Sequence, residues 1–406
     1  MSISLIYHAF GIKAKYEYIK QEFKNGAVYF TIKRPLYECK CKHCGSIKVR
    51  TRGQKERTFR NVPIGRKATY IKLRIKRLEC LECGKILQEE IPFASGQKSY
   101  TRAFQRYVLD LSKEMSIKAI ANHLGTSWDL IKQIQKEYLQ KKYAKLKAKD
   151  LRLLAIDEIA SHKGHKYLTV VMDLETGAVI YVGQGRRSAC LNGLWRKLGR
   201  YKKNIEAVAM DMWPAYIEAV TTHLANAKIV YDHFHIAKMF NEKLSDLRRA
   251  LYREATDLEQ KDVLKGTRWI LLKNSSNLNE EKNERQRLEE VLSLNKPLAT
   301  AYYLKEELRL LWAEESVDGA KIFLGNWCKK AYASGIAILK KMANTLLAHR
   351  TGIFNYFLYR ISTGPLEGTN NKIKVLKRKM YGFRDFEFFK LKIFDLHNYN
   401  FQLKGT

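Results

Sequence analysis

The stretch LRLLAIDEIA, residues 151–160, is an apolar run with an acidic residue, Asp157, near its end. Its length and its aliphatic content predict a buried strand. Because aspartate is disfavoured in strands, Asp157 is either a turn residue at the strand end or a residue with a chemical task. A second strand with the same ending would favour the chemical task.

The segments that follow provide this second strand. They predict, in order, two strands, a helix, a strand, a helix and a strand: KYLTVVMDLETGAVIYVG (166–183), ACLNGLWRKLGRY (189–201), IEAVAMDMW (205–213), PAYIEAVTTHLAN (214–226) and AKIVYDHFHIAK (227–238). The strand in IEAVAMDMW ends at Asp211. The order of elements is that of a ribonuclease-H-like α/β fold.

A third acidic residue lies in STGPLEGTNNKIKVLKRK, residues 362–379, where Glu367 precedes a run of basic residues. The basic residues are Lys372, Lys374, Lys377, Arg378 and Lys379. Pro365 suits a first helical position, so Glu367 would lie on the first turn and could cap the helix. Capping and a chemical role do not exclude each other.

The charge of the chain indicates a polyanionic partner. The formal net charge is +34, and residues 1–149 carry 33 Lys and Arg against 12 Asp and Glu. The hydrophobic content of 46% excludes a disordered basic tail and is sufficient for packed cores. Nucleic acid is therefore the first candidate for the partner, although the charge does not identify the activity.

The N-terminal sequence MSISLIYHAFGIKAKYEY does not have the pattern of a secretory signal, and no apolar run approaches the roughly 18 residues of a membrane span. We expect a cytoplasmic protein that makes no membrane contact. In that reducing compartment the seven cysteines are not expected to form disulfides.

Two CxxC turns predict a structural zinc site. The turns lie in CKCKHCG (39–45) and CLECG (80–84), and the expected ligands are Cys41, Cys44, Cys80 and Cys83. The alternating sequence ATYIKLRIKRLEC between them is typical of zinc-ribbon strands. Free structural thiols are the alternative, and Cys39 and His43 are spare potential ligands.

The segment SIKAIANHLGTSWDLIKQIQKEYLQKKYAKLK (116–147) predicts two helices separated at Gly125. TRAFQRYVLDLSKE (101–114) precedes them as another amphipathic helix, so we expect the three to form a helix-turn-helix unit. An ordinary helical hairpin is the alternative. The last helix is expected to bury its apolar residues and to present polar ones to DNA. The apolar residues are Trp128, Ile131 and Ile134, and the polar ones are Lys132, Gln133 and Lys136.

In this order, the motifs resemble those of a bacterial insertion-sequence transposase of the DDE class, from the ISL-three family. The resemblance covers essentially the whole chain: zinc ribbon, helix-turn-helix, AIDE, VAMDMWPAY, DHFH, a long helical segment and GPLEGTNNKIKVLKRKMYGFRDFEFF. It implies that Asp157, Asp211 and Glu367 form a catalytic carboxylate triad. In related enzymes with helical insertions a (C/D)xxH element follows the second aspartate, and Asp232 and His235 match this element.

The resemblance implies a transposase that binds the inverted repeats at the ends of its element and catalyses DNA cleavage and strand transfer. Two Mg²⁺ ions held by Asp157, Asp211 and Glu367 would serve this chemistry. The basic residues Lys372, Lys374, Lys377 and Arg378 would hold the backbone of the end or target DNA. A homodimer or larger assembly on DNA, at the nucleoid of a bacterial cell, is expected. The alternatives are a zinc-containing DNA-binding regulator and a ribonuclease-H-like nuclease or resolvase.

The expected architecture is α+β and multidomain, with a ribonuclease-H-like core interrupted by an all-α insertion. The expected bounds are a zinc-ribbon DNA-binding domain at 1–95, a helix-turn-helix domain at 96–149, the first part of the catalytic core at 150–241, the helical insertion at 242–345 and the second part of the core at 346–406.

Overall fold

The computed structural model describes residues 7–8, 10–12, 16–146, 148–162, 166–256, 258–380 and 384–396. The chain divides into two compact units. The first consists of Met1–Ala144 and Arg378–Thr406, and the second of Lys145–Lys377. No described helix is both long and apolar enough to cross a membrane.

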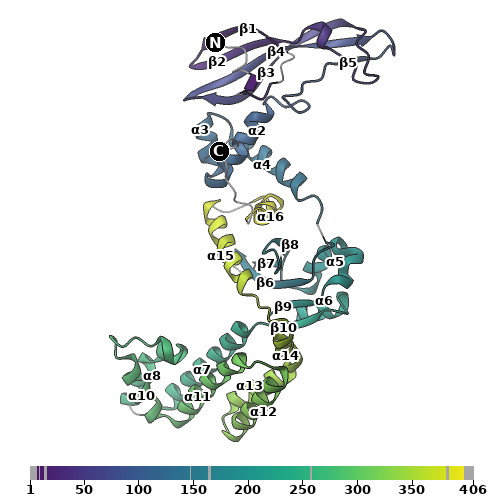
Figure 1. The fold of residues 1–406 in the computed structure, drawn as a ribbon. Coiled ribbons are helices and arrows are strands. Elements are labelled where there is room, and N and C mark those ends of the chain that lie inside the picture. The colour runs from purple at the N-terminus through teal and green to yellow at the C-terminus, as the bar shows by residue number, and fades with distance from the viewer. Residues whose placement is uncertain are drawn as a thin grey trace. The chain divides into compact units, whose positions relative to one another are not determined.

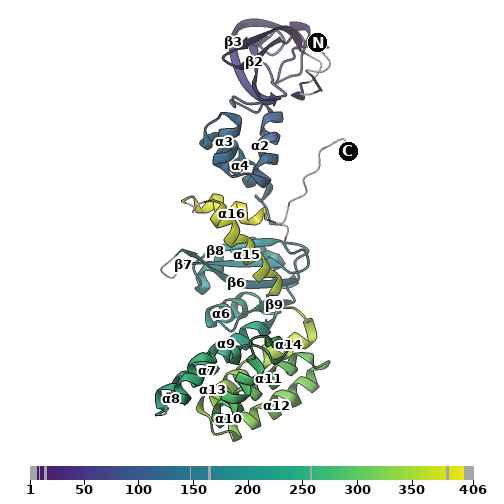
Figure 2. The same cartoon turned by 90° about the vertical axis from the view of Figure 1, so that its left-hand side faces the viewer.

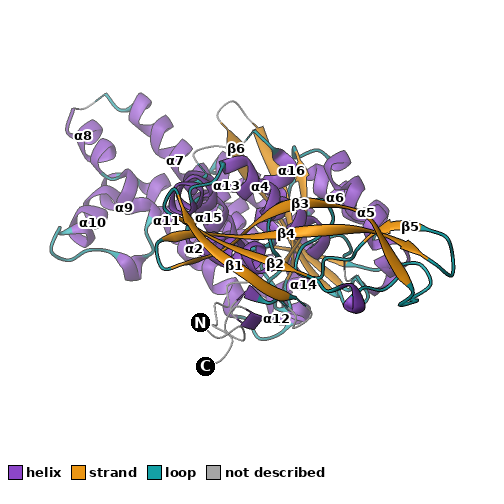
Figure 3. Ribbon diagram, turned by 90° about the horizontal axis from the view of Figure 1, so that it is seen from above, coloured by secondary structure: helices purple, strands orange, loops and turns teal. Residues whose placement is uncertain are grey.

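The first unit contains a five-stranded sheet, in which β3 and β4 are long neighbouring strands (Figure 3). The strands are β1 (Glu17–Lys24), β2 (Ala27–Lys33), β3 (Val49–Ile64), β4 (Lys67–Cys80) and β5 (Ile86–Gln88). The order is β1-β2-β4-β3, with β5 paired to β4; β2 and β4 run parallel and the other pairs are antiparallel. Apolar residues on alternate positions, such as Ile71 and Leu73, are buried against Phe30 and Phe59.

Three helices follow the sheet: α2 (Arg102–Glu114), α3 (Ile117–Leu124) and α4 (Trp128–Lys142). The side chain of Ser127 accepts a hydrogen bond from the N–H of Leu130 and caps α4. Ile131 and Ile134 are buried as predicted, so the three-helix unit is confirmed. The predicted burial of Trp128 is wrong, since this side chain is 55% exposed. Trp128 is the first residue of α4, and the buried face of the helix begins one turn later, at Ile131.

The first unit also contains α16 (Phe386–Phe394), which packs along α4 (Figure 2). Asp385 caps α16 by accepting a hydrogen bond from the N–H of Phe388, and Asp395 follows its last residue. Both aspartates pair with lysines of α4: Lys136 Nζ lies 2.8 Å from Asp385, and Lys142 Nζ lies 2.7 Å from Asp395. Each end of α16 is therefore fixed to the third helix of the helix-turn-helix unit.

The second unit is built on a sheet of order β10-β9-β6-β7-β8. Its strands are β6 (Leu153–His162), β7 (Lys166–Asp173), β8 (Val179–Gln184), β9 (Ala207–Met210) and β10 (Lys228–Tyr231). β6, β9 and β10 are parallel, whereas β7 is antiparallel to both β6 and β8. The helices α5 (Asn192–Leu198) and α6 (Pro214–His223) lie between β8 and β10 in sequence. The order of strands and helices predicted for the ribonuclease-H-like core is thus confirmed.

A series of helices follows β10, and the last of them, α15, lies against the sheet. The helices are α7 (His233–Glu254), α8 (Leu258–Gly266), α9 (Arg268–Leu272), α10 (Glu284–Leu294), α11 (Lys296–Leu310), α12 (Val317–Ala333), α13 (Ala337–Ala348), α14 (Arg350–Tyr359) and α15 (Gly364–Lys379). Ile236, Phe240 and Leu244 on α7 belong to the same apolar core as the sheet residues Ile156 and Val208. The helical segment and the sheet therefore share one core.

Short 3-10 helices complete the two units: η1 (Leu36–Glu38), η2 (Ser188–Leu191), η3 (Gly199–Asn204), η4 (Ser275–Asn277) and η5 (Leu311–Ala313).

Candidate active site

Three parallel strands bring aspartates to one edge of the parallel part of the second sheet. Asp211 and Asp232 directly follow β9 and β10, whereas Asp157 lies within β6, so the prediction that its strand ends there is wrong: the strand continues to His162 because it stays paired with β7. In β6 and β9, Leu153 is the partner of Ala207 and Ala155 is the partner of Ala209. Two residues further along the same register, Asp157 lies opposite Asp211. The strand β10 continues this arrangement, because Tyr231 pairs with Met210 and is followed by Asp232.

Asp157 and its neighbour Glu158 point to opposite faces of the sheet. Adjacent residues of a strand alternate between faces, and Ile156 belongs to the core that α5 and α6 cover. Glu158 lies on that side, with its carboxylate 3.5 Å from the hydroxyl of Tyr216 on α6. Asp157 faces α15, where the side-chain amide of Asn370 donates a hydrogen bond to Asp157 Oδ2 at 2.7 Å. Figure 1 shows α15 and the pair α5 and α6 on opposite sides of the sheet.

The carboxylates of Asp157 and Asp211 influence each other. Burial raises the pKa of Asp157, and the negative charge of Asp211 raises it further, whereas the Glu158 N–H and the charge of His235 lower it. Burial also raises the pKa of Asp211, and the charges of His235 and Lys238 oppose that rise. Two aspartates at this edge therefore share a poorly hydrated environment, with His235 close to both.

Asp232 links the start of α7 to the start of α15. Its side chain is 2% exposed and accepts a hydrogen bond from the N–H of Phe234 at 3.1 Å, which caps α7. Its other oxygen accepts a hydrogen bond from the hydroxyl of Thr363. Because Thr363 immediately precedes α15, Asp232 fixes the helix that carries Glu367.

Glu367 lies on the first turn of α15 and is exposed. Its N–H donates to the carbonyl of Thr363 at 2.9 Å, as in a regular helix. Its carboxylate accepts no hydrogen bond from the residues that the structure describes, so Glu367 does not cap α15 there. Asn370, one turn later on the same helix, is buried and donates a hydrogen bond to Asp157 of β6.

The structure brings Asp157 and Asp211 together, but Glu367 does not form a compact ligand cluster with these two aspartates. Among the described residues, only the four cysteines form a group of three or more His, Cys, Asp or Glu ligand atoms that all lie within 4.8 Å of one another. Asn370, which sequence reasoning missed, occupies the position next to Asp157. Its only signal in the sequence is its spacing of three residues from Glu367.

The basic residues after Glu367 are mostly exposed on α15. Lys372, Lys374 and Arg378 are exposed, and Lys377 is half-buried. The amine of Lys374 donates to the side chain of Asn371 at 3.1 Å. The apolar side of the helix, formed by Leu366, Ile373 and Leu376, is buried.

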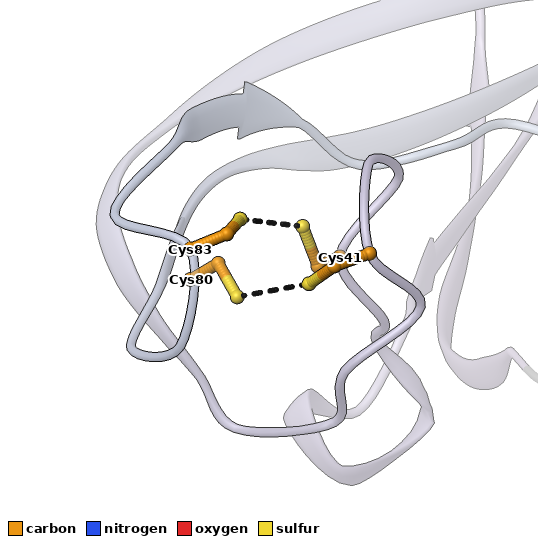
Figure 4. A group of neighbouring side chains, drawn as sticks. Cys41, Cys80 and Cys83 are labelled. Carbon is orange, nitrogen blue, oxygen red and sulfur yellow. Dashed lines mark hydrogen bonds between the residues drawn. The ribbon is translucent and has the colours of Figure 1, made fainter.

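The four cysteines that the sequence predicts as zinc ligands lie together in the first unit. The Sγ atoms of Cys41 and Cys83 are 3.7 Å apart (Figure 4). Those of Cys44 and Cys80 are 3.5 Å apart. Tetrahedral zinc with Zn–S bonds near 2.3 Å requires sulfur separations of roughly 3.8 Å. The donor set and its spacing therefore fit one structural Zn²⁺.

The two turns that carry the cysteines have the same local structure. Gly45 donates its N–H to the carbonyl of Cys41, and Gly84 donates to the carbonyl of Cys80. Both glycines have a positive φ, 77° and 67°, which favours glycine at these positions. The repeated turn explains why each CxxC pair in the sequence is followed by glycine.

The spare ligands of this region lie outside the sulfur cluster. The thiol of Cys39 is buried and donates to the carbonyl of Pro35 and the carboxylate of Glu89. His43 contributes its backbone N–H to Cys41 Sγ at 3.4 Å, and its side chain is not a member of the cluster.

The residues predicted to read DNA on α4 have protein partners. Lys132 and Lys136 lie 3.1 and 2.8 Å from the carboxylate of Asp385, and Gln133 donates to Glu137 at 2.8 Å. Asp385 is another residue that the sequence did not reveal, because it lies some 250 residues from its partners. Gln133 is exposed, whereas the two lysines are half-buried.

Three family models match the chain in the same order as the structural elements. A zinc-finger model of the transposases IS204, IS1001, IS1096 and IS1165 matches residues 37–83. A model of the helix-turn-helix domain of transposase family ISL3 matches residues 89–139, and the ISL3 DDE transposase model matches residues 154–393.

Two known transposases are similar over most of their length. The transposase for insertion sequence element IS1001 of Bordetella parapertussis is 32% identical over 358 residues, which cover 87% of each chain. The transposase for insertion sequence element IS1557 of Mycobacterium tuberculosis is 26% identical over 370 residues, which cover 85% of this chain and 82% of the relative. The solved Drosophila P element transposase strand transfer complex aligns with a TM-score of 0.41 and 13% identity, over 73% of this chain and 91% of that one.

Proposed function

The chain belongs to the ISL3 family of transposases, and from this premise we propose that Asp157, Asp211 and Glu367 carry its DNA cleavage and strand transfer. Membership of a transposase family decides against a regulator and against a resolvase. The observation that carries the assignment of residues is the contact of α15 with β6. The side-chain amide of Asn370 donates a hydrogen bond of 2.7 Å to Asp157 Oδ2, and Glu367 lies one turn away from Asn370 on the same helix.

We propose Mg²⁺ as the cofactor of this site. Carboxylate and amide oxygens are the ligands that this hard cation prefers. Asn370 is 4% exposed and donates through its amide nitrogen to Asp157, whereas its oxygen is buried and has no hydrogen-bond partner among the described residues. An unsatisfied buried acceptor beside the Asp157 carboxylate fits a hydrated cation, whose water ligands are donors. When bound as a pair, such ions activate the attacking oxygen and stabilise the leaving one.

Cation binding, positioning of α15 and binding of the DNA backbone would fall to different residues of the chain. Asp157 and Asp211 would hold the cations from the sheet, and Glu367 would approach them from α15. Asp232 is a positioning residue, because its bond to Thr363 fixes the start of that helix. His235 lies beside both aspartates and favours their ionised forms. The exposed Lys372, Lys374 and Arg378, with Lys377, would bind the DNA backbone.

Recognition of the terminal repeats would belong to the first unit. The helix-turn-helix unit of α2, α3 and α4 supplies a helix for a major groove, and the zinc ribbon adds a basic surface. We further propose that the protein acts on the ends of its element and on target DNA as a homodimer or larger assembly, at the bacterial nucleoid.

Glu367→Gln is the sharpest test of the triad. The amide keeps the size of the side chain and loses the charge that holds a cation. We expect cleavage of end DNA in Mg²⁺ to be nearly abolished while binding of the same DNA is retained. Glu387, an exposed acid on α16, is the alternative third acid, and Glu387→Gln is the matched comparison that should cleave normally. Cleavage by Glu367→Gln at the wild-type rate would remove Glu367 from the triad.

A further inference from the structure

A groove runs along one face of α7 and leads away from the acidic edge of the sheet. It is a cavity of about 470 Å³ that begins at Phe234 and Lys238 and ends between Arg249 on α7 and Arg268 on α9. Its floor follows helical spacing, with Asn241 and Ser245 between these ends. We call this feature the α7 groove.

Basic side chains outnumber acidic ones in the α7 groove. Lys238, Arg248, Arg249 and Arg268 line it together with two acids. One of the acids, Asp246, is already paired with Arg249. Within the described residues, Lys238, Arg248 and Arg268 form no ion pair with an acidic side chain. The groove therefore has an uncompensated positive charge.

The three arginines lie close enough to repel one another. Arg248 donates through Nη1 to the carbonyl of Leu264 at 2.8 Å, so its position is fixed. Burial lowers the pKa of Arg248, and the charges of Arg268 and Arg249 lower it further. A phosphate between such groups would replace this repulsion with charge-assisted hydrogen bonds.

The start of the groove is next to the proposed active site. The helix α7 begins at His233, immediately after Asp232, which follows β10 at the edge that carries Asp157 and Asp211. From Lys238 to Arg249 the helix rises by roughly 16 Å at 1.5 Å per residue. One strand of duplex DNA carries a phosphate every 3.4 Å or so along its axis, so about five phosphates span that distance.

We propose that the α7 groove binds the phosphate backbone of the DNA strand that passes through the active site. The inference rests on the proposed function, since it takes DNA as the occupant. Its continuity with the aspartates favours a strand of DNA over a separate small anion. The groove would hold the strand on the far side of the cleaved bond from the contacts of α15.

The test compares two double variants of the full-length protein. Arg249→Ala with Arg268→Ala removes two exposed groove charges, and Lys340→Ala with Lys341→Ala removes two exposed charges of α13, which do not line the groove. Binding to a duplex containing the element's end and its flanking DNA is measured by fluorescence anisotropy over a range of salt concentrations, without Mg²⁺. Zinc content and melting are measured for each protein.

We expect the groove variant to bind about tenfold more weakly at moderate salt, with a slope of log affinity against log salt that is smaller by about 2. The control should keep the wild-type affinity and slope. Equal affinity for groove variant and control would overturn the inference, as would a loss of affinity with an unchanged slope. Wild-type protein that does not distinguish end DNA from random duplex would contradict the proposed function instead.

A second measurement tests the inference without the groove double variant, so its result does not depend on whether that variant folds. A photo-crosslinking amino acid at Ser245, on the floor of the groove, should attach to labelled DNA at nucleotides next to the cleaved bond. The same amino acid at Lys340 should not attach there. Failure of Ser245 to crosslink while the protein binds end DNA would overturn the inference. Loss of the crosslink in millimolar inorganic phosphate, at constant ionic strength and with DNA binding retained, would show a small-anion site instead and would also overturn it.

Discussion

At the scale of single residues, the buried carboxylates at the acidic edge of the second sheet destabilise the folded protein when they are ionised. Burial raises the pKa values of Asp157, Glu158 and Asp211, which means that their ionised forms are less favourable in the folded protein than in water. Such a cluster is retained only where the charges have a task. The same feature makes the site testable without measuring activity.

Asp211→Asn should stabilise the metal-free protein at pH 7 by roughly 1 kcal/mol, because it removes a poorly solvated charge. The amide oxygen can still accept the 3.1 Å hydrogen bond from the N–H of Trp213. The raised pKa sets the sign: the penalty is absent at low pH and grows as pH rises through the folded-state pKa. Thermal melting should therefore show a gain at pH 7 that disappears toward pH 4. A loss of stability at pH 7 would mean that partners in the fold compensate the Asp211 charge.

Asn370→Ala should increase the Mg²⁺ concentration needed for cleavage, because Asp157 loses the donor that orients its carboxylate. Binding of end DNA should be unchanged. Asn371→Ala is the matched control, since Asn371 is the next residue and is exposed. The Mg²⁺ dependence of melting gives a readout that does not require catalysis, and an unchanged dependence for Asn370→Ala would contradict the positioning role.

Some residues of the site could be predicted from the sequence, and others could not, for a physical reason. Asp157 and Asp211 were visible because each is an acidic residue directly after an apolar run. Asn370 was not visible, because Thr369, Asn370 and Asn371 are three adjacent polar residues and only packing selects the one that faces the sheet. Lys132 and Lys136 were predicted to face DNA from their helical position, and their partner Asp385 follows only from the tertiary fold.

At the scale of secondary-structure elements, the pairing of α16 with α4 is the contact that most affects DNA recognition. The hydrogen bonds from Lys136, the Phe388 N–H and Lys132 outweigh burial and hold the pKa of Asp385 well below its ordinary value. The ring of Phe394 lies 5.7 Å from that of Tyr143, beyond the end of α4. The helix proposed to enter a groove of DNA is therefore supported on one side by the chain's own α16.

Asp385→Asn should loosen α16, since the amide keeps the helix cap but loses the charge that pairs with two lysines. We expect a loss of about 1 kcal/mol at pH 7. The depressed pKa sets the opposite sign from Asp211: the stabilisation is present above the unfolded-state pKa, near 4, and is lost as pH falls through the folded-state pKa. Hydrogen exchange of residues 386–394 should be faster in the variant at pH 7.

Asp110→Asn is the control for this change, because Asp110 pairs with Lys113 on the surface of α2 in the same unit. A surface pair of this kind contributes little. If both variants exchange α16 at the wild-type rate, Asp385 does not fix that helix.

At the scale of the whole molecule, the chain consists of two units with separate cores, and they should respond separately to loss of metal. Cys80→Ser removes one of the four ligands of the zinc site. We expect loss of zinc and unfolding of the zinc-ribbon region, because structural zinc sites contribute directly to folding. The second unit should keep its own melting transition.

Atomic absorption and differential scanning calorimetry would check this prediction. Cys190→Ser is the control, since Cys190 lies in the second unit, outside the sulfur cluster. Full zinc content in Cys80→Ser would contradict the four-thiolate site.

The order of elements could be predicted at this scale, whereas the grouping of elements into units could not. Strand and helix patterns are local, so the succession from β6 to α15 was visible in the sequence. The bounds 346–406 for the end of the core remain a prediction, and the structure groups Arg378–Thr406 with the N-terminal unit. That grouping depends on ion pairs such as Lys142–Asp395, between residues more than 250 positions apart.

The packing of α16 on α4 also sets a time interval during synthesis. A ribosome makes α4 more than two hundred residues before it makes α16. At 5–20 residues per second, this delay is roughly ten to fifty seconds. Throughout that interval Lys132, Lys136 and Lys142 have no Asp385 or Asp395 to pair with, so a nascent chain presents a more basic α4 than the finished protein. The first DNA that a new chain encounters, close to the place where the chain is being made, would therefore meet an α4 that binds DNA more tightly and less selectively.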